Sequence, residues 1–447
     1  MERSSPLLVR RRLARAGAWL HKRLFPAALL LLTAGCEDLF DDLLGTVDLP
    51  NQILADSLET PSRAALIVEG ALADFECAFS AAVAWGALLG DEFSTGDVSF
   101  LGEVDRRDLQ DLRNVFWAER DCAAAGVWGN WVPLSVARWS SDNALRLLEQ
   151  WSDAQVNNRQ SLIATAALYS GYAHVFLAES FCSITLDVGP EMTPAQVFQR
   201  AEQRFDQAIN AAQGSSNTTM LHAARLGRAR TRLNRGNLNG AMEDAPQVPD
   251  GFALTAAYST VSPRTPNHVA AFNRLSRTSI SPVVYGQVSV GAFYRDLRFA
   301  GVRDPRVPVQ DAGIQELSGA QRLWVQLKYA DDASPIPFAR SAEARLITAE
   351  VAARGGQLQT AVDIINSLHA RVGLPAFSSN DQAKVIQQVL YERRAELFLE
   401  GHHLGDYRRY ELPFDPAVGT PHFTGRPYGD DRCFPLPAAE RDANPNA

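Results

Sequence analysis

Apolar residues recur at helical spacing along several long stretches of the chain, separated by segments without a clear period. Residues 61–89 keep this spacing throughout and begin with a proline, which suits a first helical turn. Gly90 and Asp91 mark the end of this predicted helix. Between 92 and 125 the period is lost among glycine, serine, aspartate and arginine, so we predict a long loop region with short helical pieces.

The stretch from Trp128 to Trp151 is periodic again and predicts a second helix. Asn143 interrupts the apolar face of this helix, which includes Trp139 and Leu147, at a spacing that points the amide inward. A buried asparagine needs hydrogen-bond partners and usually ties down neighbouring backbone. We therefore interpret Asn143 as a structural residue and not as a ligand-binding one.

An internal repeat organises the middle of the chain. Seven residues recur 120 positions later in the same order: Ala224, Arg225, Leu226, Ala229, Gly236, Leu238 and Ala241 in the first copy, and Ala344, Arg345, Leu346, Ala349, Gly356, Leu358 and Ala361 in the second. In each copy an alanine-rich helix ends at a glycine and a second helix follows. Small residues there let two helices cross closely, as in tetratricopeptide helix pairs. A third pair fits 161–181 followed by 194–212.

The repeat contains an insertion, because a displacement of 120 residues is not a multiple of the tetratricopeptide period of about 34. It lies between Pro246 and Arg340, where nine of the 24 prolines occur among glycine, serine and threonine. Residues 281–290 and 323–329 are candidate short strands within it. The predicted fold is therefore mainly α: tetratricopeptide-like helix pairs forming a superhelical scaffold, with a long irregular insertion that contains a few short strands.

The composition is globular and argues against a nucleic-acid partner. Hydrophobic residues make up 46% of the chain and charged residues 21%. Residues 1–35 hold seven of the 43 basic residues and one of the 51 acidic ones, so the rest carries a net charge near −14. A chain this acidic is a poor match to a phosphate backbone.

The N-terminus has the order of an export signal. A basic segment precedes the apolar run 26–35, which is too short to span a membrane, and Cys36 follows at once. This order resembles the lipobox of bacterial lipoproteins, in which the cysteine accepts a diacylglyceryl group, although Thr33 replaces the preferred aliphatic residue. We predict a signal peptide over 1–35, a lipid anchor on Cys36 that holds the protein to the membrane, and an acidic tether over 36–60. The alternative is an ordinary cleavage site beside an incidental cysteine.

Four further cysteines remain, namely Cys77, Cys122, Cys182 and Cys433. An even number outside the cytosol predicts up to two disulfides, with three connectivities that the sequence cannot separate. A zinc site is the alternative, but the paired Cys or His spacings of such sites do not occur. We expect no metal and no cofactor.

Four segments of the chain, taken in order, resemble the SusD/RagB family. They are Trp139 with Asn143 and Leu147, then Ala342–Gly373, Glu392–Tyr410 and the closing segment Phe434–Asn446, with its Pro437, Glu440, Asn444 and Pro445. The third segment departs from the family's usual run at His403, Leu404, Gly405 and Tyr410. These departures mark a divergent branch of the family.

The resemblance implies a function as well as a fold. Members of the family are outer-membrane lipoproteins that capture nutrients for a TonB-dependent transporter. We therefore expect a single SusD-like domain over 61–447, facing the cell exterior, that binds a nutrient, with a glycan as the expected ligand, and delivers it to a SusC-like transporter without catalysis. Aromatic rings in the irregular insertions, about 92–125 and 250–335, are expected to hold the ligand. The candidates are Phe100, Trp117, Tyr285, Phe293 and Tyr294.

Charged residues near the C-terminus form a separate cluster. Glu392, Glu396 and Glu400 lie four apart, on one face of a predicted helix that also carries Arg393. A turn at Gly401 leads to Asp406 and Arg409. We interpret all seven residues as structural, because ion pairs that lock the last helices together explain them better than acid/base catalysis.

Two alternative functions stay open. The chain has no Gly-x-Ser-x-Gly elbow, phosphate loop, dinucleotide fingerprint or His-Glu-x-x-His motif. A helical-toroid glycoside hydrolase is the enzyme alternative, since its paired carboxylates need no fixed spacing along the chain. A purely structural helical-repeat lipoprotein scaffold, which would bind only protein, is the other.

Overall fold

The computed structural model describes residues 58–98, 100–109, 121–122, 129–261, 266–273 and 286–447. Residues Glu59–Ala447 pack as one unit. The predicted signal peptide, Cys36 and nearly all of the predicted tether lie outside the described residues.

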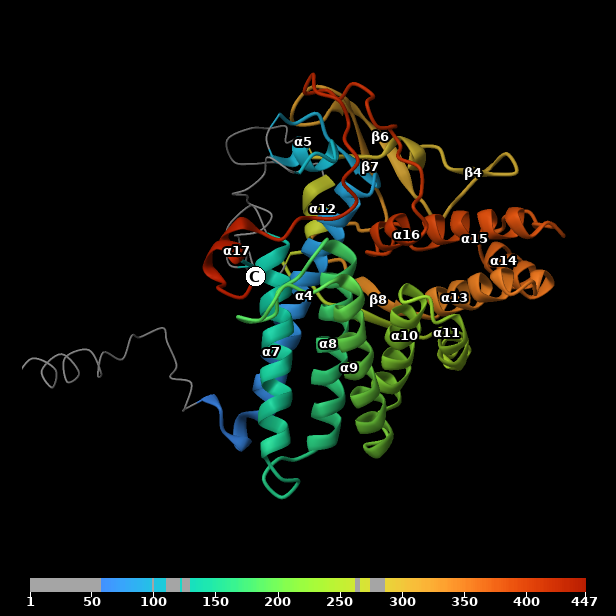
Figure 1. The fold of residues 1–447 in the computed structure, drawn as a ribbon. Helices are drawn as coiled ribbons and strands as arrows, with labels where there is room; N and C mark the ends of the chain where they lie inside the picture. Colours follow the sequence, from blue (N-terminus) through green and yellow to red (C-terminus); the bar gives the residue numbers. More distant parts are fainter. Residues whose placement is uncertain (1–57, 99, 110–120, 123–128, 262–265, 274–285) are drawn as a thin grey trace, which may run out of the picture. The chain divides into compact units, whose positions relative to one another are not determined.

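Long helices build the scaffold of this unit (Figure 1). They are α4 Ala64–Leu89, α7 Trp131–Gln150, α8 Arg159–Ser180, α9 Pro194–Gly214, α10 Thr218–Asn234, α13 Ser341–Arg354, α14 Leu358–Val372 and α15 Gln382–Glu396, and the short helix α11 Leu238–Asp244 completes one of their pairs. Shorter helices are η1 Pro61–Arg63, α5 Phe100–Asp105, η2 Ala245–Gln247, α12 His268–Asn273, η3 Ala292–Tyr294, α16 His403–Arg409 and α17 Ala438–Ala443. Neighbouring long helices lie side by side, with α8 packed against both α7 and α9.

The predicted helix pairs are present as α8 with α9, α10 with α11, and α13 with α14. Gly236 and Gly356 both have positive φ angles, +74° and +79°, just after the first helix of their pairs. A left-handed residue at this position ends a helix, and glycine adopts it without a steric cost. The predicted mainly α, tetratricopeptide-like fold is therefore confirmed.

The core lies between α4, α8 and the strand β8 (Ile336–Arg340) and contains a cluster of aromatic rings. The ring of Phe338 lies 5.2 Å from that of Phe75 and 5.1 Å from that of Tyr172, both in edge-on contact. Among the described residues, α8 alone is long and apolar enough to cross a membrane. Most of it is buried in the protein, so its composition reflects the core.

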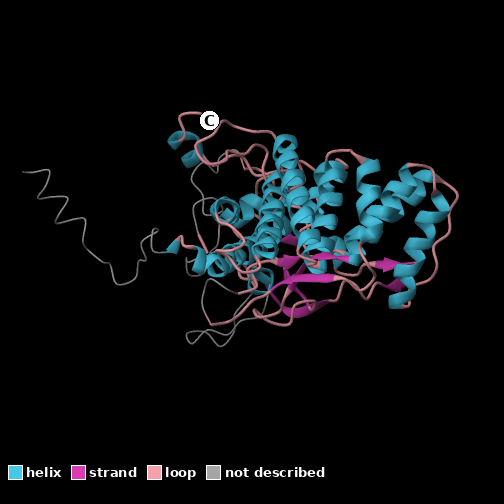
Figure 2. Ribbon diagram, turned by 90° about the horizontal axis from the view of Figure 1, so that it is seen from below, coloured by secondary structure: helices cyan, strands magenta, loops and turns pink. Residues whose placement is uncertain are grey.

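Four antiparallel strand pairs lie on one side of the helices, as Figure 2 shows. They are β1 Phe93–Ser94 with β3 Ser289–Val290, β2 Ala253–Ala256 with β8 Ile336–Arg340, β4 Arg298–Phe299 with β5 Val302–Arg303, and β6 Val309–Gln315 with β7 Arg322–Gln326. The β2–β8 pair joins the two ends of the insertion, with Leu254 opposite Ala339. Because the insertion returns to its starting point, α13 packs against α11 as the next element of the scaffold.

The β1–β3 pair joins the two irregular segments in which ligand binding was predicted. Phe93 lies opposite Val290, and the hydroxyl of Thr95 donates to the carbonyl of Gln287 over 3.0 Å. The backbone N–H of Gly96 donates to the buried carboxylate of Glu316 over 3.1 Å. Segments almost 200 residues apart in the chain are thus held together by backbone and side-chain hydrogen bonds.

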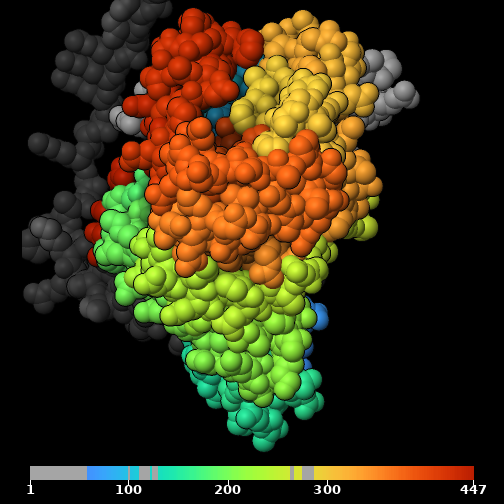
Figure 3. All heavy atoms as spheres, turned by 90° about the vertical axis from the view of Figure 1, so that its right-hand side faces the viewer, coloured from blue at the N-terminus to red at the C-terminus, as the bar shows by residue number. Residues whose placement is uncertain are grey.

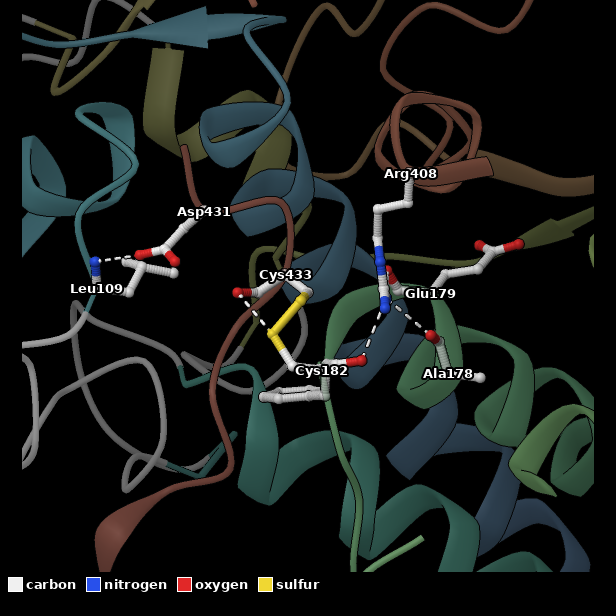
Figure 4. The surroundings of a disulfide bond; sticks show 8 residues. Leu109, Ala178, Glu179, Cys182, Arg408, Asp431 and Cys433 are labelled. Carbon is white, nitrogen blue, oxygen red and sulfur yellow. Dashed lines mark hydrogen bonds between the residues drawn. A yellow bond between two sulfur atoms is a disulfide. The ribbon is translucent and has the colours of Figure 1, made fainter. Parts of the chain in front are cut away.

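The cysteines form two disulfides, Cys77–Cys122 and Cys182–Cys433. The second lies at the C-terminal end of α8 and fastens the C-terminal segment there (Figure 4). In the same place Arg408 of α16 donates to the carbonyls of Ala178, Glu179 and Phe181 over 2.9, 2.7 and 3.1 Å. Burial lowers the pKa of Arg408 to about 10. These carbonyls end a helix and lack partners within it, so the guanidinium acts as their cap.

The predicted apolar face of α7 is buried except at Trp139. Leu147 is buried as predicted, and so are Ala144 and Leu148 beside it, whereas the side chain of Trp139 is 53% exposed. Asn143 is half-buried, and its amide donates to Glu59 over 3.0 Å, so it bonds a side chain and not the backbone expected. The helical period places Trp139 on this face, but packing against α4 and α8 leaves its ring partly exposed.

Overpacking the helix crossings should lower stability. Ala229 and Ala349 are fully buried, so replacing either with leucine forces extra atoms between packed helices. We expect each variant to lose about 1–3 kcal/mol in free energy of unfolding, measured by urea titration. The control is Ala383→Leu, at an exposed position of α15. Equal stability of all three variants would show that these crossings have free space.

Candidate functional site

A surface crevice lies between segments that are distant in sequence. We call the described residues of 92–109, 286–327 and 412–432 the cap. Figure 3 shows the cap hollowed between its C-terminal part, in red, and its 286–327 part, in yellow and gold, with blue-green atoms of the N-terminal part at the bottom. The crevice is therefore built from both predicted ligand segments and from a third that the sequence analysis did not select.

Hydrogen bonds of His422 fix the C-terminal part of the cap to its N-terminal part. The backbone N–H of Thr424 donates to Nδ1 of His422 over 3.1 Å, so Nε2 carries the proton and donates to Asp105 over 3.0 Å. Asp105 also accepts from the backbone N–H of Thr95 over 3.0 Å. Burial raises the pKa of Asp105, and its bonds to His422 and Thr95 oppose this.

A buried arginine provides a second link within the cap. The guanidinium of Arg107, which is 1% exposed, lies 4.7 Å from the ring centres of both Phe414 and Tyr428. A cation between two aromatic faces is attracted to both rings. The walls of the crevice are therefore held in place by partners that are themselves buried.

Two of the five predicted ligand residues can be judged in full. Tyr294 is fully buried, and its ring is stacked 4.8 Å from that of Phe398. It is a core residue, so the prediction of an exposed ligand-binding ring is wrong for Tyr294. Phe293 is half-buried, and the guanidinium of Arg394 covers one face of its ring at 3.5 Å. Only the rest of that ring is available to a ligand.

The other three predicted ligand residues remain predictions. Trp117 and Tyr285 lie outside the described residues. Phe100 begins α5, but its side chain is outside the described part of the structure.

Sequence reasoning missed Trp324, on strand β7 of the cap. Its indole is half-buried, and the guanidinium of Arg295 lies 5.9 Å from the ring centre. Arg295 also donates to Gln321 over 2.9 Å, and burial lowers the pKa of Arg295. An indole with an arginine and an amide beside it can stack on an apolar ring face while the polar groups bind hydroxyls. The predicted strand 323–329 contained Trp324, but its sequence pattern does not show that the ring stays only partly buried against the core.

The seven residues of the C-terminal cluster that were predicted to be structural lie in or beside a network of buried charges. Glu392 is fully buried and pairs with Arg306 over 2.6 Å and with His369 over 2.7 Å. Glu396 and Glu400 both pair with Arg340, over 2.8 and 2.7 Å. The partners of the three glutamates come from the insertion, from the end of β8 and from α14, and not from the neighbouring arginines expected.

The expected single helical face of these glutamates is also wrong, because α15 ends at Glu396. Glu400 lies beyond it and takes a second cation, Lys328, at 2.6 Å. Gly401 follows with a φ of +75°, and a Cβ atom there would lie 2.9 Å from the side chain of Val83. A residue larger than glycine would clash at this turn, so the close approach to α4 requires it.

The remaining members of the set join the last helices as predicted. Arg393 pairs with Asp406 over 2.6 Å, and Arg409 pairs with Asp406 over 2.8 Å and with Glu350 of α13 over 3.0 Å. Burial would raise the pKa of Asp406, but the guanidinium groups of Arg393 and Arg409 outweigh it and lower this pKa to about 2. A buried carboxylate that is paired in this way stays charged.

One acid in this region lacks hydrogen bonds. Glu343 of α13 is fully buried, and neither of its carboxylate oxygens has a hydrogen-bond partner. The basic side chains near it are His402 at 3.6 Å and Arg230 at 3.8 Å, but burial lowers the pKa of His402 well below its usual value, so only Arg230 of these two is a cation. Burial raises the pKa of Glu343 to about 7, and Arg230 and Arg393 only partly oppose this.

Comparisons with known proteins show which proteins the chain resembles in sequence and in fold. Residues 326–446 match the model of the SusD family. A SusD-like carbohydrate binding protein from Bacteroides vulgatus ATCC 8482 has 15% identity and a TM-score of 0.63, over 87% of this chain and 97% of that one. A SusD superfamily protein from the same organism has 17% identity and a TM-score of 0.62, over 86% and 97%. A SusD-like protein from Bacteroides fragilis NCTC 9343 has 12% identity and a TM-score of 0.62, over 91% and 98%.

The fold is therefore that of the SusD superfamily, and it extends over most of the chain. The resemblance to the SusD/RagB family that the sequence indicated is confirmed. No curated protein sequence matches the chain.

Replacing Glu343 with glutamine should change how stability depends on pH. Between about pH 4.5 and pH 7 the native protein holds a proton on Glu343 that the unfolded chain releases, so stability falls as the pH rises. Because glutamine does not titrate, the Glu343→Gln variant does not lose stability in this way as the pH rises. Its free energy of unfolding should gain up to about 3 kcal/mol relative to the wild type between pH 4.5 and pH 8.

Urea unfolding at several pH values measures this difference. Glu243→Gln is the control, because the side chain of Glu243 is 72% exposed. A Glu343→Gln difference that stays constant with pH, like that of the control, would contradict the buried titration.

Proposed function

We propose that the protein is a carbohydrate-binding lipoprotein of the cell surface, which delivers its ligand to a SusC-like, TonB-dependent transporter in the outer membrane. The observation that carries this proposal is the SusD-like fold over most of the chain, with a cap crevice built where its two long irregular segments meet. One of the similar structures is named a carbohydrate binding protein. The acidic chain and its lipoprotein-like N-terminus support the same function.

The cap is the proposed glycan site. Sugars present apolar ring faces and rows of hydroxyl groups, so they bind where an aromatic ring lies beside fixed polar groups. Trp324, with Arg295 and Gln321 beside it, offers this combination on the described part of the cap. The cap loops are tied to buried partners such as Asp105 and Glu316, which suits loops that must hold a ligand without reordering.

We infer that this binding is not followed by catalysis. Glu392, Glu396 and Glu400 are the acids that the sequence analysis weighed for acid/base catalysis, and each is ion-paired to Arg306 or Arg340. A glycosidase acid needs an open position beside the scissile bond and a proton to give. The three ion-paired glutamates lie inside the scaffold, so they have neither an open position for a substrate nor a proton to donate.

The delivery step follows from the proposed anchor. Acyl chains on Cys36 would hold the protein in one leaflet, and such a protein cannot move a solute across a membrane by itself. A β-barrel transporter in the same membrane supplies the path. The acidic segment after Cys36 would serve as the linker between the lipid anchor and the folded unit.

Anchor and partner can be tested in one fractionation experiment. Tagged wild-type protein should appear in the outer-membrane fraction and co-purify with a β-barrel transporter after gentle detergent extraction. The Cys36→Ala variant should leave that fraction, because it lacks the acylated thiol. Cys36→Ala remaining in the membrane, or a solitary wild-type protein although the transporter is present, would contradict the corresponding half of the proposal.

Glycan binding at the cap can be tested by calorimetric titration with a panel of oligosaccharides. For a glycan that binds the wild type, Trp324→Ala should weaken binding by about 1–3 kcal/mol, and Trp324→Phe should lose less because it keeps a ring. Leu66→Ala is the matched control, since Leu66 is an exposed apolar residue of α4 outside the cap. Unchanged affinity of Trp324→Ala would remove Trp324 from the site.

A further inference from the structure

A second hollow opens outside the cap, at the N-terminal end of α7, beside the short helix α17 (Figure 1). It is open to solvent and has a volume of about 280 Å³. Its wall combines one face of α7 with the segment that follows α8 and with Glu440 of α17. This volume is near the lower limit for small-molecule sites, about 300 Å³, and suits a single ring.

An exposed aromatic platform borders the hollow. Trp139 is 53% exposed, and Val136, one turn earlier on α7, is 41% exposed. Both line the hollow together with Trp131, which is only 5% exposed. A half-exposed indole on a helix does not contribute the full free energy that burial of its apolar surface would give. Such exposure is unusual for tryptophan, the residue with the largest apolar surface.

Fixed polar groups line the same hollow. Arg138, which is 5% exposed, donates to both carboxylate oxygens of Asp187 over 3.2 and 2.8 Å. The side chain of Asp187 is itself 60% exposed, so its remaining acceptor positions face water. The hydroxyl of Thr185 donates to Glu440 over 2.7 Å, which orients a second carboxylate at the same hollow.

The wall is held rigidly by the C-terminal segment. The amide of Asn444 donates to the carbonyl of Gly189 over 2.8 Å, and that of Asn446 donates to the carbonyl of Val188 over 2.7 Å. The Cys182–Cys433 disulfide fastens the same two segments, as Figure 4 shows. The distance between the platform and the carboxylates is therefore set before any ligand arrives.

We propose that this hollow is a second glycan subsite, which binds one pyranose ring. The indole of Trp139 stacks on the apolar face of the sugar, and Asp187 and Glu440 accept hydrogen bonds from its hydroxyl groups. The choice of a sugar as the ligand class rests on the proposed function. The single platform, the small volume and the carboxylate acceptors favour a pyranose over a protein partner, which would need a wider apolar surface.

The experiment follows the tryptophan residues by fluorine NMR. The full chain, labelled with fluorotryptophan and purified in mild detergent, is titrated with maltohexaose and with cellohexaose. Trp139→Phe identifies the resonance of residue 139. We expect at least one of the two probes to shift that resonance, and Asp187→Asn to weaken this binding at least threefold.

The Trp324→Ala variant separates this inference from the proposed cap site. A shift of the residue 139 resonance that persists in Trp324→Ala supports an independent subsite. Shifts confined to other tryptophans overturn the subsite and leave the proposed function standing. The absence of any shift with either probe overturns the subsite for these glycans, whereas the calorimetric panel decides the proposed function.

A resonance of residue 139 that moves with protein concentration, without glycan, is a further possible result. It would show that copies of this chain contact each other at the hollow, and it too overturns the subsite. Leu66→Ala, at an exposed position outside the hollow, is the matched control and should leave the residue 139 resonance and its titration unchanged.

Discussion

A carboxylate buried in a protein interior is stable only when cations and hydrogen bonds replace the water it has lost. The glutamates at the end of α15 meet this condition through partners from distant parts of the chain. Arg306 of the insertion reaches the fully buried Glu392, although 86 residues separate them. Arg340, which ends β8, serves both Glu396 and Glu400. If the insertion did not fold back onto the scaffold, Glu396 and Glu400 would lose Arg340. Glu392 would keep His369 but lose Arg306.

This requirement connects the irregular parts of the molecule to its helices. The insertion leaves and returns through the β2–β8 pair, and its cap part is bound to the first irregular segment through β1–β3. Arginine side chains from the irregular insertion therefore reach the interior of the protein. The ring of Trp324, in the same insertion, stays near the surface. A rigid frame of helix pairs with function in the loops that it positions is a common division of roles in repeat proteins.

The C-terminal segment contributes to both proposed ligand surfaces. Its residues 412–432 form one wall of the cap, and Glu440 lines the hollow beside α7. Between them, Cys433 is bonded to Cys182 at the end of α8, close to the carbonyls that Arg408 caps. The Cys182–Cys433 disulfide therefore holds the C-terminal segment between the two proposed ligand surfaces. This covalent link explains why an otherwise irregular segment has a defined path.

The sequence by itself determined the helices, the repeat with its turns at Gly236 and Gly356, and the mainly α, SusD-like fold, because these depend on local period, on backbone conformation and on motifs in a fixed order. Only the tertiary structure decided which side chains are exposed and which charges are paired. The period of α7 could not tell that Trp139 points to water, and nothing near Tyr294 in the chain revealed that Phe398 would bury it. Exposure and pairing depend on neighbours that lie tens of residues or more away in the chain, and a local sequence pattern does not report them.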